Sequence, residues 1–224
     1  MSESRKEREF KQRELEILEV AIALFSKQGL DKVTVADIAK ATDIGKGTIY
    51  KHFVSKDVIL ARIANDFSRT LLKSVYNIDT TKSCEEQMHK MFEICFTAHV
   101  EFPLTSEIYY LYQQPSILQR LPQAYQQEYL AIENEFFTIF NKICEEGKKN
   151  SELPDLPADE IILGAYATFI GALDMIKNKQ LHCFIDAPQI SQQSFINFII
   201  NYTLTGIFGR RFDNQVTTSG DTHE

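Results

Sequence analysis

The sequence contains no run of about 18 apolar residues, the length that a membrane-spanning helix needs. Residues 1–13 are charged throughout and lack the apolar core of a secretory signal. Its 9 glycines and 6 prolines are few for 224 residues, which argues against an all-β protein with many turns. We therefore expect a cytoplasmic protein that has no membrane partner.

Cysteine motifs are also missing. Cys84, Cys95, Cys144 and Cys183 form neither a CxxC motif nor the spacing of a metal finger. We interpret them as small apolar residues in a reducing compartment, and a redox-sensing role stays open.

The charge is unevenly spread along the chain. Residues 1–75 hold 14 Lys and Arg and 11 Asp and Glu, a net of +3, whereas residues 76–224 hold 10 and 20, a net of −10. Hydrophobic residues make up 44% and charged residues 25%, which is typical of a globular chain with a real core. The length allows one large domain or two small ones, and the asymmetry indicates that its parts have different tasks.

Apolar residues recur at helical spacing in almost every segment. Thr34, Ser55 and Ser83 resemble helix N-caps, and Gly29 resembles a helix stop. The pattern predicts helices over 6–28, 35–41, 46–52, 56–78, 84–102, 159–178 and 191–208, a broken helical stretch over 105–146 and a loop over 147–158.

The two short helices at 35–41 and 46–52, joined by a tight turn at Asp43 and Gly45, follow the helix-turn-helix plan. Ile38, Ile44 and Ile49 would form its interior, with short or cationic side chains on the outer face of the second helix. Such a helix can enter a major groove and reach base edges.

Residues 38–53 read IAKATDIGKGTIYKHF, followed by Ser55 and Lys56. This segment resembles the TetR (tetracycline-repressor-type) family of bacterial transcription regulators, whose pattern is I-A-x-x-A-G-V-S-x-G-T-x-Y-x-[HY]-F-x-[SN]-K. The resemblance covers about residues 10–60, and the rest matches only in length and all-helical plan. Three positions depart from the pattern: Thr42, Asp43 and Gly45. We expect Asp43 to adopt a left-handed conformation, and Gly45 to contact DNA only through its backbone amide.

The resemblance, together with side-chain chemistry, implies a set of DNA-contacting residues. Phosphate contacts are expected from Thr34, Tyr50, His52 and Lys56. We expect Lys46, Thr48 and Lys51 to read base edges, with phosphate contact as the alternative for both lysines. Gly47 would let the backbone approach the duplex. Five basic residues near the start form either an arm on the DNA or a plain solvated helix face: Arg5, Lys6, Arg8, Lys11 and Arg13.

Twenty of the 25 aromatic residues lie beyond residue 75. They form a bundle core or line a ligand cavity between helices. The resemblance implies a small effector, and lining candidates are Phe92, Phe96, His99, Tyr109, Tyr112, Phe136 and Phe140. Glu93, Glu101, Glu107 and Asp174 would suit a lipophilic cation, and an acyl or other neutral lipophilic ligand is the alternative.

Two stripes of residues in the last two helices predict a dimer interface, with packing inside one chain as the alternative. The stripes are Gly164, Thr168, Gly171, Ala172 and Met175, and Phe195, Phe198, Ile199, Tyr202 and Gly206. A two-fold homodimer could read one palindromic operator of double-stranded DNA.

Other classes have weaker support. Glu86 and His89 match half of a di-iron motif, but a second half is missing and Glu86 also fits a helix cap. The sequence has no HExxH, phosphate-binding glycine loop or GxSxG, so we expect no enzyme, metal or other cofactor. A helix-turn-helix regulator controlled by a protein partner remains open.

We therefore predict an all-α chain with an N-terminal three-helix DNA-binding head and a C-terminal helical bundle for dimerisation and ligand binding. The expected divisions are 1–55 for the head, 56–78 for a connecting helix, 79–209 for the effector and dimerisation domain, and 210–224 for a polar tail.

Overall fold

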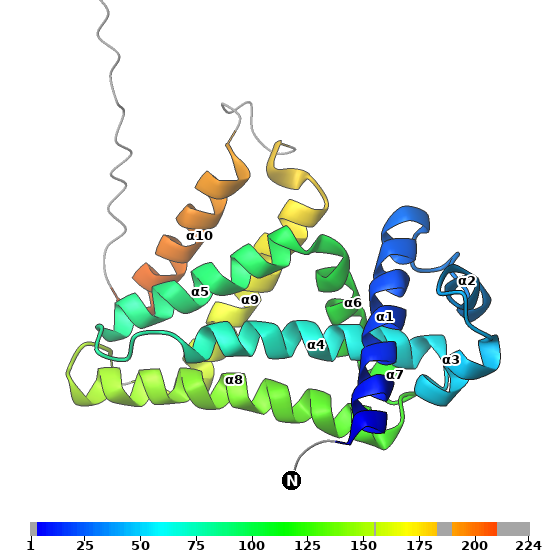
Figure 1. The fold of residues 1–224 in the computed structure, drawn as a ribbon. Coiled ribbons are helices and arrows are strands. Elements are labelled where there is room, and N and C mark those ends of the chain that lie inside the picture. Colours follow the sequence, from blue (N-terminus) through cyan, green and yellow to red (C-terminus); the bar gives the residue numbers. More distant parts are fainter. Residues whose placement is uncertain (1–3, 155, 183–189, 210–224) are drawn as a thin grey trace, which may run out of the picture. The chain divides into compact units, whose positions relative to one another are not determined.

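The computed structural model describes residues 4–154, 156–182 and 190–209 (Figure 1). In these ranges the chain is helical, without a strand, which confirms the all-α class. The α-helices are α1 (Arg5–Gln28), α2 (Val35–Ala41), α3 (Lys46–His52), α4 (Lys56–Tyr76), α5 (Cys84–Glu101), α6 (Pro103–Gln113), α7 (Pro115–Leu118), α8 (Gln123–Lys149), α9 (Ala158–Lys177) and α10 (Gln192–Ile207), with a 3₁₀ turn η1 (Gln180–His182).

The helix starts follow from the capping residues in the sequence. At the start of α2 the Asp37 amide donates to the Thr34 hydroxyl at 3.3 Å, and the Asp37 carboxylate accepts from the Thr34 amide at 2.9 Å. Ser83 and Glu86 form the same reciprocal pair before α5. Ser55 accepts from the Val58 amide before α4. The predicted caps are confirmed, because each satisfies free amides at a helix start.

The turn between α2 and α3 is made by a residue other than glycine. Asp43 has a φ of 53°, the left-handed conformation expected of it. The Ile44 amide donates to the Ala39 carbonyl at 3.1 Å, and the Thr42 hydroxyl donates to the Ile38 carbonyl at 2.8 Å. These bonds close the turn and fix the direction in which α3 leaves it.

The described chain divides into two compact units. The first, which we call the head unit, comprises residues 1–77 and 97–138 and so takes in α1–α4, the end of α5, α6, α7 and the first part of α8. α4 packs closely along α6, and α1 contacts α2, α4 and α6. Their shared core contains the fully buried Ile17, Ile38, Ile49, Phe53, Ile59 and Ile108. α2 and α3 are thus held on a continuous apolar core.

The second unit, the C-terminal unit, comprises residues 78–96 and 139–224. In its described part α9 packs against α10, and the rings of Phe96 on α5 and Phe169 on α9 lie 4.6 Å apart, edge to face. No helix in the described ranges is long and apolar enough to cross a membrane. The predicted domain boundaries at 55/56 and 78/79 stay predictions.

The loop predicted over 147–158 begins too early, because α8 continues to Lys149. Gly147 lies inside the helix and packs against Cys84, since a Cβ at position 147 would fall 2.6 Å from the Cys84 Sγ. This glycine therefore permits close helix packing instead of ending the helix. That role depends on a partner far away in sequence.

Two of the cysteines are buried in this same region. Burial raises the pKa of the Cys84 thiol to about 12 and that of the Cys144 thiol to about 11. Thiols with such pKa values remain protonated at neutral pH and are poor nucleophiles. Cys183 lies outside the described residues.

Candidate nucleic-acid interface

α3 turns one face inward and the other outward. Ile49 and Phe53 are fully buried in the head core, whereas Tyr50 is 42% exposed. The N-cap is Gly45, which supplies no side-chain hydrogen bond to the first turn of α3. The first turn of α3 therefore lacks the side-chain cap that Thr34 gives α2 and Ser55 gives α4.

The outward face is polar and open. Lys46, Gly47 and Lys51 are exposed and Thr48 is partly buried. The Lys46 ammonium lies 5.7 Å from the centroid of the Tyr50 ring, within cation–π range. A Cβ built on Gly47 would meet nothing within 4 Å, so packing inside the chain does not require glycine there.

His52 differs from the other expected DNA contacts, because its imidazole turns toward α1. The His52 side chain is only 7% exposed, and its ring lies 4.0 Å from the Phe10 ring. Its Nδ1 is 3.9 Å from a Glu14 carboxylate oxygen and has no hydrogen-bond partner among the described residues. The imidazole thus packs α3 against α1.

Lys56, also expected on a phosphate, is engaged inside the head. Its ammonium donates to the Leu30 backbone carbonyl and lies 5.7 Å from the centroid of the Phe25 ring. These contacts tie the start of α4 to the end of α1. Lys56 therefore has a structural task that its sequence position did not indicate.

Thr34 is exposed, but its hydroxyl is already used at the start of α2. It donates to the Asp37 carboxylate at 2.6 Å while accepting from the Asp37 amide. The hydrogen bonds from Thr34 hold the pKa of Asp37 below its usual value. A phosphate on this hydroxyl would have to compete with a charged acceptor.

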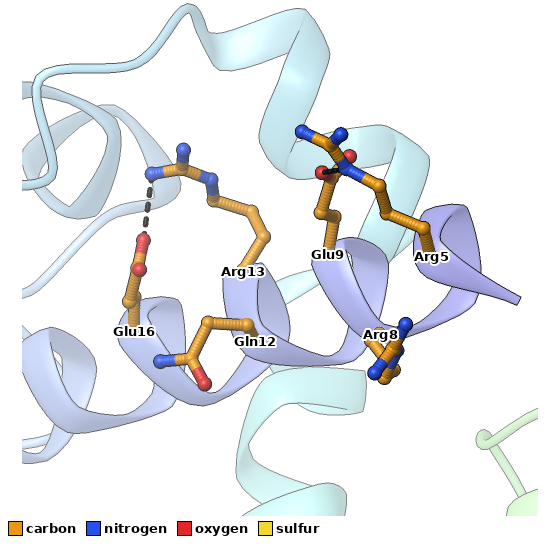
Figure 2. Close-up of a pocket in the computed structure, with 6 residues that line it drawn as sticks. All are labelled: Arg5, Arg8, Glu9, Gln12, Arg13 and Glu16. Atoms are coloured by element: carbon orange, nitrogen blue, oxygen red, sulfur yellow. Dashed lines mark hydrogen bonds and ion pairs between the residues drawn. The ribbon is translucent and has the colours of Figure 1, made fainter. Parts of the chain in front are cut away.

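The basic residues near the chain start belong to α1. Figure 2 shows Arg5 beside Glu9 and Arg13 beside Glu16, while Arg8 points away from both pairs. The two ion pairs have N–O distances of 2.8 Å and 2.6 Å. From Arg5 onward these residues lie on the exposed part of α1, and their contact with DNA stays a prediction.

A chain of ion pairs, which we call the ion ladder, links helices far apart in sequence. Arg62 on α4 reaches Glu14 on α1 at 3.4 Å and Asp66 at 2.9 Å. Arg69 bridges Asp66 at 2.6 Å and also pairs with Glu128 on α8. The ladder therefore runs from α1 along α4 to α8 inside the head unit.

The residues expected to line an effector site fall in both units. In the head unit, His99 and Tyr109 lie with ring centroids 5.5 Å apart, Phe136 is partly buried, and the Tyr112 hydroxyl donates to Asp57 at 3.3 Å. In the C-terminal unit, Phe92 and Phe140 lie 6.5 Å apart and Phe96 packs on Phe169. Their roles in ligand binding stay predictions.

Glu133 was not anticipated from the sequence. It directly follows Ile132, which belongs to the apolar repeat Ile132, Phe136 and Phe140 on α8. An acid next to this repeat was the feature of the sequence that could have indicated a carboxyl near the buried face. Its carboxylate accepts a hydrogen bond from the Tyr109 hydroxyl at 3.0 Å. Burial raises the pKa of this carboxyl to about 7.

The predicted dimer stripes lie on α9 and α10. Phe198 and Tyr202 are 46% and 56% exposed, and their rings stack at 6.2 Å. A groove between the two helices is lined by Gly164, Thr168, Tyr202 and Gly206 among others. Of the other predicted residues, Gly171 is exposed, Thr168, Met175, Phe195 and Ile199 are partly buried, and Ala172 is buried.

The di-iron alternative rested on Glu86 and His89. The Glu86 carboxylate accepts from the Ser83 amide and hydroxyl at 3.1 Å and 2.9 Å, so it caps α5. Within the described ranges, the structure brings together no group of three or more metal-ligating side chains.

Comparisons with known proteins place this geometry in context. The sequence model of the family described as "Bacterial regulatory proteins, tetR family" matches residues 17–63. The probable HTH-type transcriptional regulator YttP of Bacillus subtilis is 30% identical over 151 residues, which cover 66% of this chain and 70% of that protein. The HTH-type transcriptional repressor KstR2 of Mycobacterium tuberculosis is 34% identical over 84 residues, which cover 37% of this chain and 42% of that protein.

Solved structures share the fold over most of the chain. A TetR/AcrR-family transcriptional regulator from Thermobifida fusca has a TM-score of 0.66 at 22% identity, covering 87% of this chain and 98% of that one. The regulator FadR from Bacillus subtilis, in complex with stearoyl-CoA, has a TM-score of 0.63 at 17% identity, covering 86% and 98%.

Proposed function

Because this chain belongs to the TetR family of helix-turn-helix transcriptional regulators, which are not enzymes, we propose that it is a repressor. It would bind a palindromic operator as a homodimer and leave the operator when a small lipophilic effector binds. One observation carries the DNA-binding part. The outer face of α3 presents Lys46, Gly47 and Lys51 to solvent while Ile49 anchors the helix in the core. A rigid helix with an open cationic face suits the major groove.

We assign the DNA contacts by what each side chain already does inside the chain. Lys46, Thr48 and Lys51 read bases or hold phosphates, Tyr50 holds a phosphate, and the Gly45 and Gly47 backbone lies against the duplex. Thr34, His52 and Lys56 serve mainly to position α2, α3 and α4, because their polar groups or rings already have partners inside the chain.

The homodimer is supported by the exposed rings on α10. Phe198 and Tyr202 would bury a large apolar area against the partner copy, and Gly164 and Gly206 would let the helices approach closely. In such a dimer two copies of α3 would read successive major grooves, about 34–36 Å apart.

The effector response is supported by what related folds hold. The FadR structure contains stearoyl-CoA, whose acyl chain is apolar, and KstR2 is named a repressor. An effector that binds one placement of α4 more tightly than another would change the spacing of the two α3 helices. DNA affinity would then fall by the ratio of the two effector affinities.

Selection of bound DNA from a random pool tests this function. We expect enrichment of an inverted repeat whose half-sites lie one or more helical turns apart. Lys46→Ala should change the selected bases, whereas Lys73→Ala, which removes an exposed lysine from the end of α4, should leave them unchanged. Recovery of no preferred sequence would contradict the proposal.

A further inference from the structure

The ion ladder is one connected network and not a set of separate pairs. Arg62 donates through Nε to both Asp66 oxygens, at 3.1 Å and 2.9 Å, and its Nη1 donates to a Glu14 oxygen at 3.4 Å. Arg69 then connects Asp66 to Glu128. Because two arginines share the Asp66 carboxylate, the pair at α1 and the pair at α8 have a common member on α4.

The charges of the ladder are unequal and only partly hydrated. Three carboxylates face two guanidinium groups, and the five side chains are between 15% and 38% exposed. Salt therefore screens these charges less than it screens fully exposed pairs. Loss of either arginine would leave three carboxylates with one cation, so a break at one pair changes the charge balance at the others.

α1 is the support on which the helix-turn-helix rests. The His52 ring at the end of α3 packs on Phe10, and its Nδ1 lies 3.9 Å from Oε1 of Glu14. The other oxygen of that carboxylate, Oε2, is the one that pairs with Arg62. α1 also contacts α2. The ladder thus meets α1 at the face that supports α3, and the orientation of α2 and α3 depends on that of α1.

α8 and α6 are joined to α4 in different ways. α6 packs closely along α4, with Ile108 fully buried in the shared core. The links from α8 include the ion pair of Glu128 with Arg69. Further along, the Tyr76 hydroxyl donates to Glu135 at 3.0 Å. Ion pairs at partly exposed sites are individually weak, so a movement of α8 can break the first link without opening the core.

We propose that Arg62 and Glu128 are positioning residues for α3: the ladder holds α1, and with it α2 and α3, in the orientation that fits DNA, and a movement of α8 releases this orientation at Glu128. The assignment rests on the proposed function, because it concerns how α3 is presented to an operator. It differs from a change in the spacing of two α3 helices, since the ladder lies inside a single chain. His52 packs on α1 but is outside the ladder, so its loss leaves α1 in place.

Hydrogen exchange followed by mass spectrometry tests the positioning role on the full chain without DNA. Glu128→Gln removes the charge at the α8 end of the ladder. Glu135→Gln makes the same charge change on the same helix, at the Tyr76 link outside the ladder. We expect the amides of residues 35–53 to exchange at least threefold faster in Glu128→Gln and at the native rate in Glu135→Gln. Exchange in α6 should stay unchanged in both variants, because its packing on α4 is apolar.

Operator affinity gives the second measurement. Arg62→Met removes the charge but keeps an unbranched side chain, and Arg120→Met makes the same charge change at an exposed position of the head unit. We expect Arg62→Met to lower the affinity for the selected operator about tenfold more than Arg120→Met. Circular dichroism verifies that each variant is folded. Glu128→Gln against Glu135→Gln repeats the comparison with milder changes, and there we expect a difference of about threefold.

Three results would overturn the proposal: Glu128→Gln leaves the exchange of residues 35–53 unchanged, α6 exchanges faster by the same factor, or both affinity comparisons show equal losses. The exchange measurement needs no operator, so it reports on the ladder separately from the proposed function. A chain that selects no preferred DNA sequence can still show the exchange difference, and a chain that selects one can still fail to show it.

Discussion

The outer and inner faces of α3 carry polar side chains in opposite situations. On the outer face, Lys46 and Lys51 extend into solvent from a helix whose Gly47 has open space around it. On the inner side, His52 packs on Phe10. All four residues match or flank the same family pattern, yet only the outer ones leave their polar groups available. Of these pattern residues, we therefore expect the outer ones to contact DNA and His52 to hold α3 against α1.

The same contrast separates the acids of the head unit. Asp66 and Glu128 are neutralised by arginines of the ion ladder, whereas Glu133 faces a phenol. The arginines favour the ionised form of Asp66 and Glu128, whereas burial beside a neutral phenol favours the protonated form of Glu133. This comparison can be tested at each site by measuring stability and binding separately.

The largest effect is expected from Gly47→Ala. Alanine is a better helix former, so the free energy of unfolding should rise by about 0.5–1 kcal/mol. DNA affinity should fall roughly 100-fold, or about 2.7 kcal/mol, because the added methyl would separate the helix from the duplex. Urea denaturation and fluorescence anisotropy with the selected operator give the two numbers.

Equal affinity of Gly47→Ala and the native chain would show that the duplex does not approach this backbone. The outer face of α3 would then not be the surface that contacts DNA.

A smaller effect is expected from Glu133→Gln on stability. The pKa of Glu133 is raised from 4.5 to about 7 in the folded chain, so the folded state holds this proton more tightly than the unfolded state. Ionisation therefore costs stability as pH rises from about 4.5 to 7, and the variant removes that cost. Relative to the native chain, the variant should gain about 1–2 kcal/mol between pH 5 and pH 8, less than the full shift implies because the group is partly accessible.

The pH dependence of stability in the native chain alone would not isolate the contribution of Glu133. Burial lowers the pKa of His99, which removes stability as pH falls from about 6.5 toward 4, so the two groups act in opposite directions. The difference between variant and native chain cancels the His99 contribution. A difference independent of pH would mean that Glu133 titrates normally.

The smallest effects are expected from the adjacent pair Lys51→Ala and His52→Ala. Lys51→Ala should lower DNA affinity up to tenfold and reduce the slope of log affinity against log salt by about one, with little change in stability. His52→Ala should lower the free energy of unfolding by about 1 kcal/mol through lost packing on Phe10, and change DNA affinity less than twofold. Titrations at several salt concentrations separate the two.

The reverse pattern, in which His52→Ala weakens DNA binding tenfold at unchanged stability, would assign His52 to the interface as the sequence alone suggested.

Local chemistry was predictable from the sequence, whereas side-chain direction was not. The Thr34–Asp37 cap and the left-handed Asp43 depend on neighbours within a few residues, so the pattern contains their cause. The inward turn of His52 depends on Glu14 and Phe10 from another helix, and the Tyr109–Glu133 bond joins residues 24 apart. No spacing rule in one sequence encodes such contacts.

The close contact between Gly147 and Cys84 restricts which residues can replace Gly147. A methyl at position 147 would fall 2.6 Å from the Cys84 Sγ and 2.8 Å from its Cβ. A change at 147 alone therefore forces the two helices apart, and shortening residue 84 to alanine would still leave the Cβ in the way. A side chain at 147 therefore requires either a shift of the two helices or glycine at position 84, so we expect changes at the two positions to be coupled.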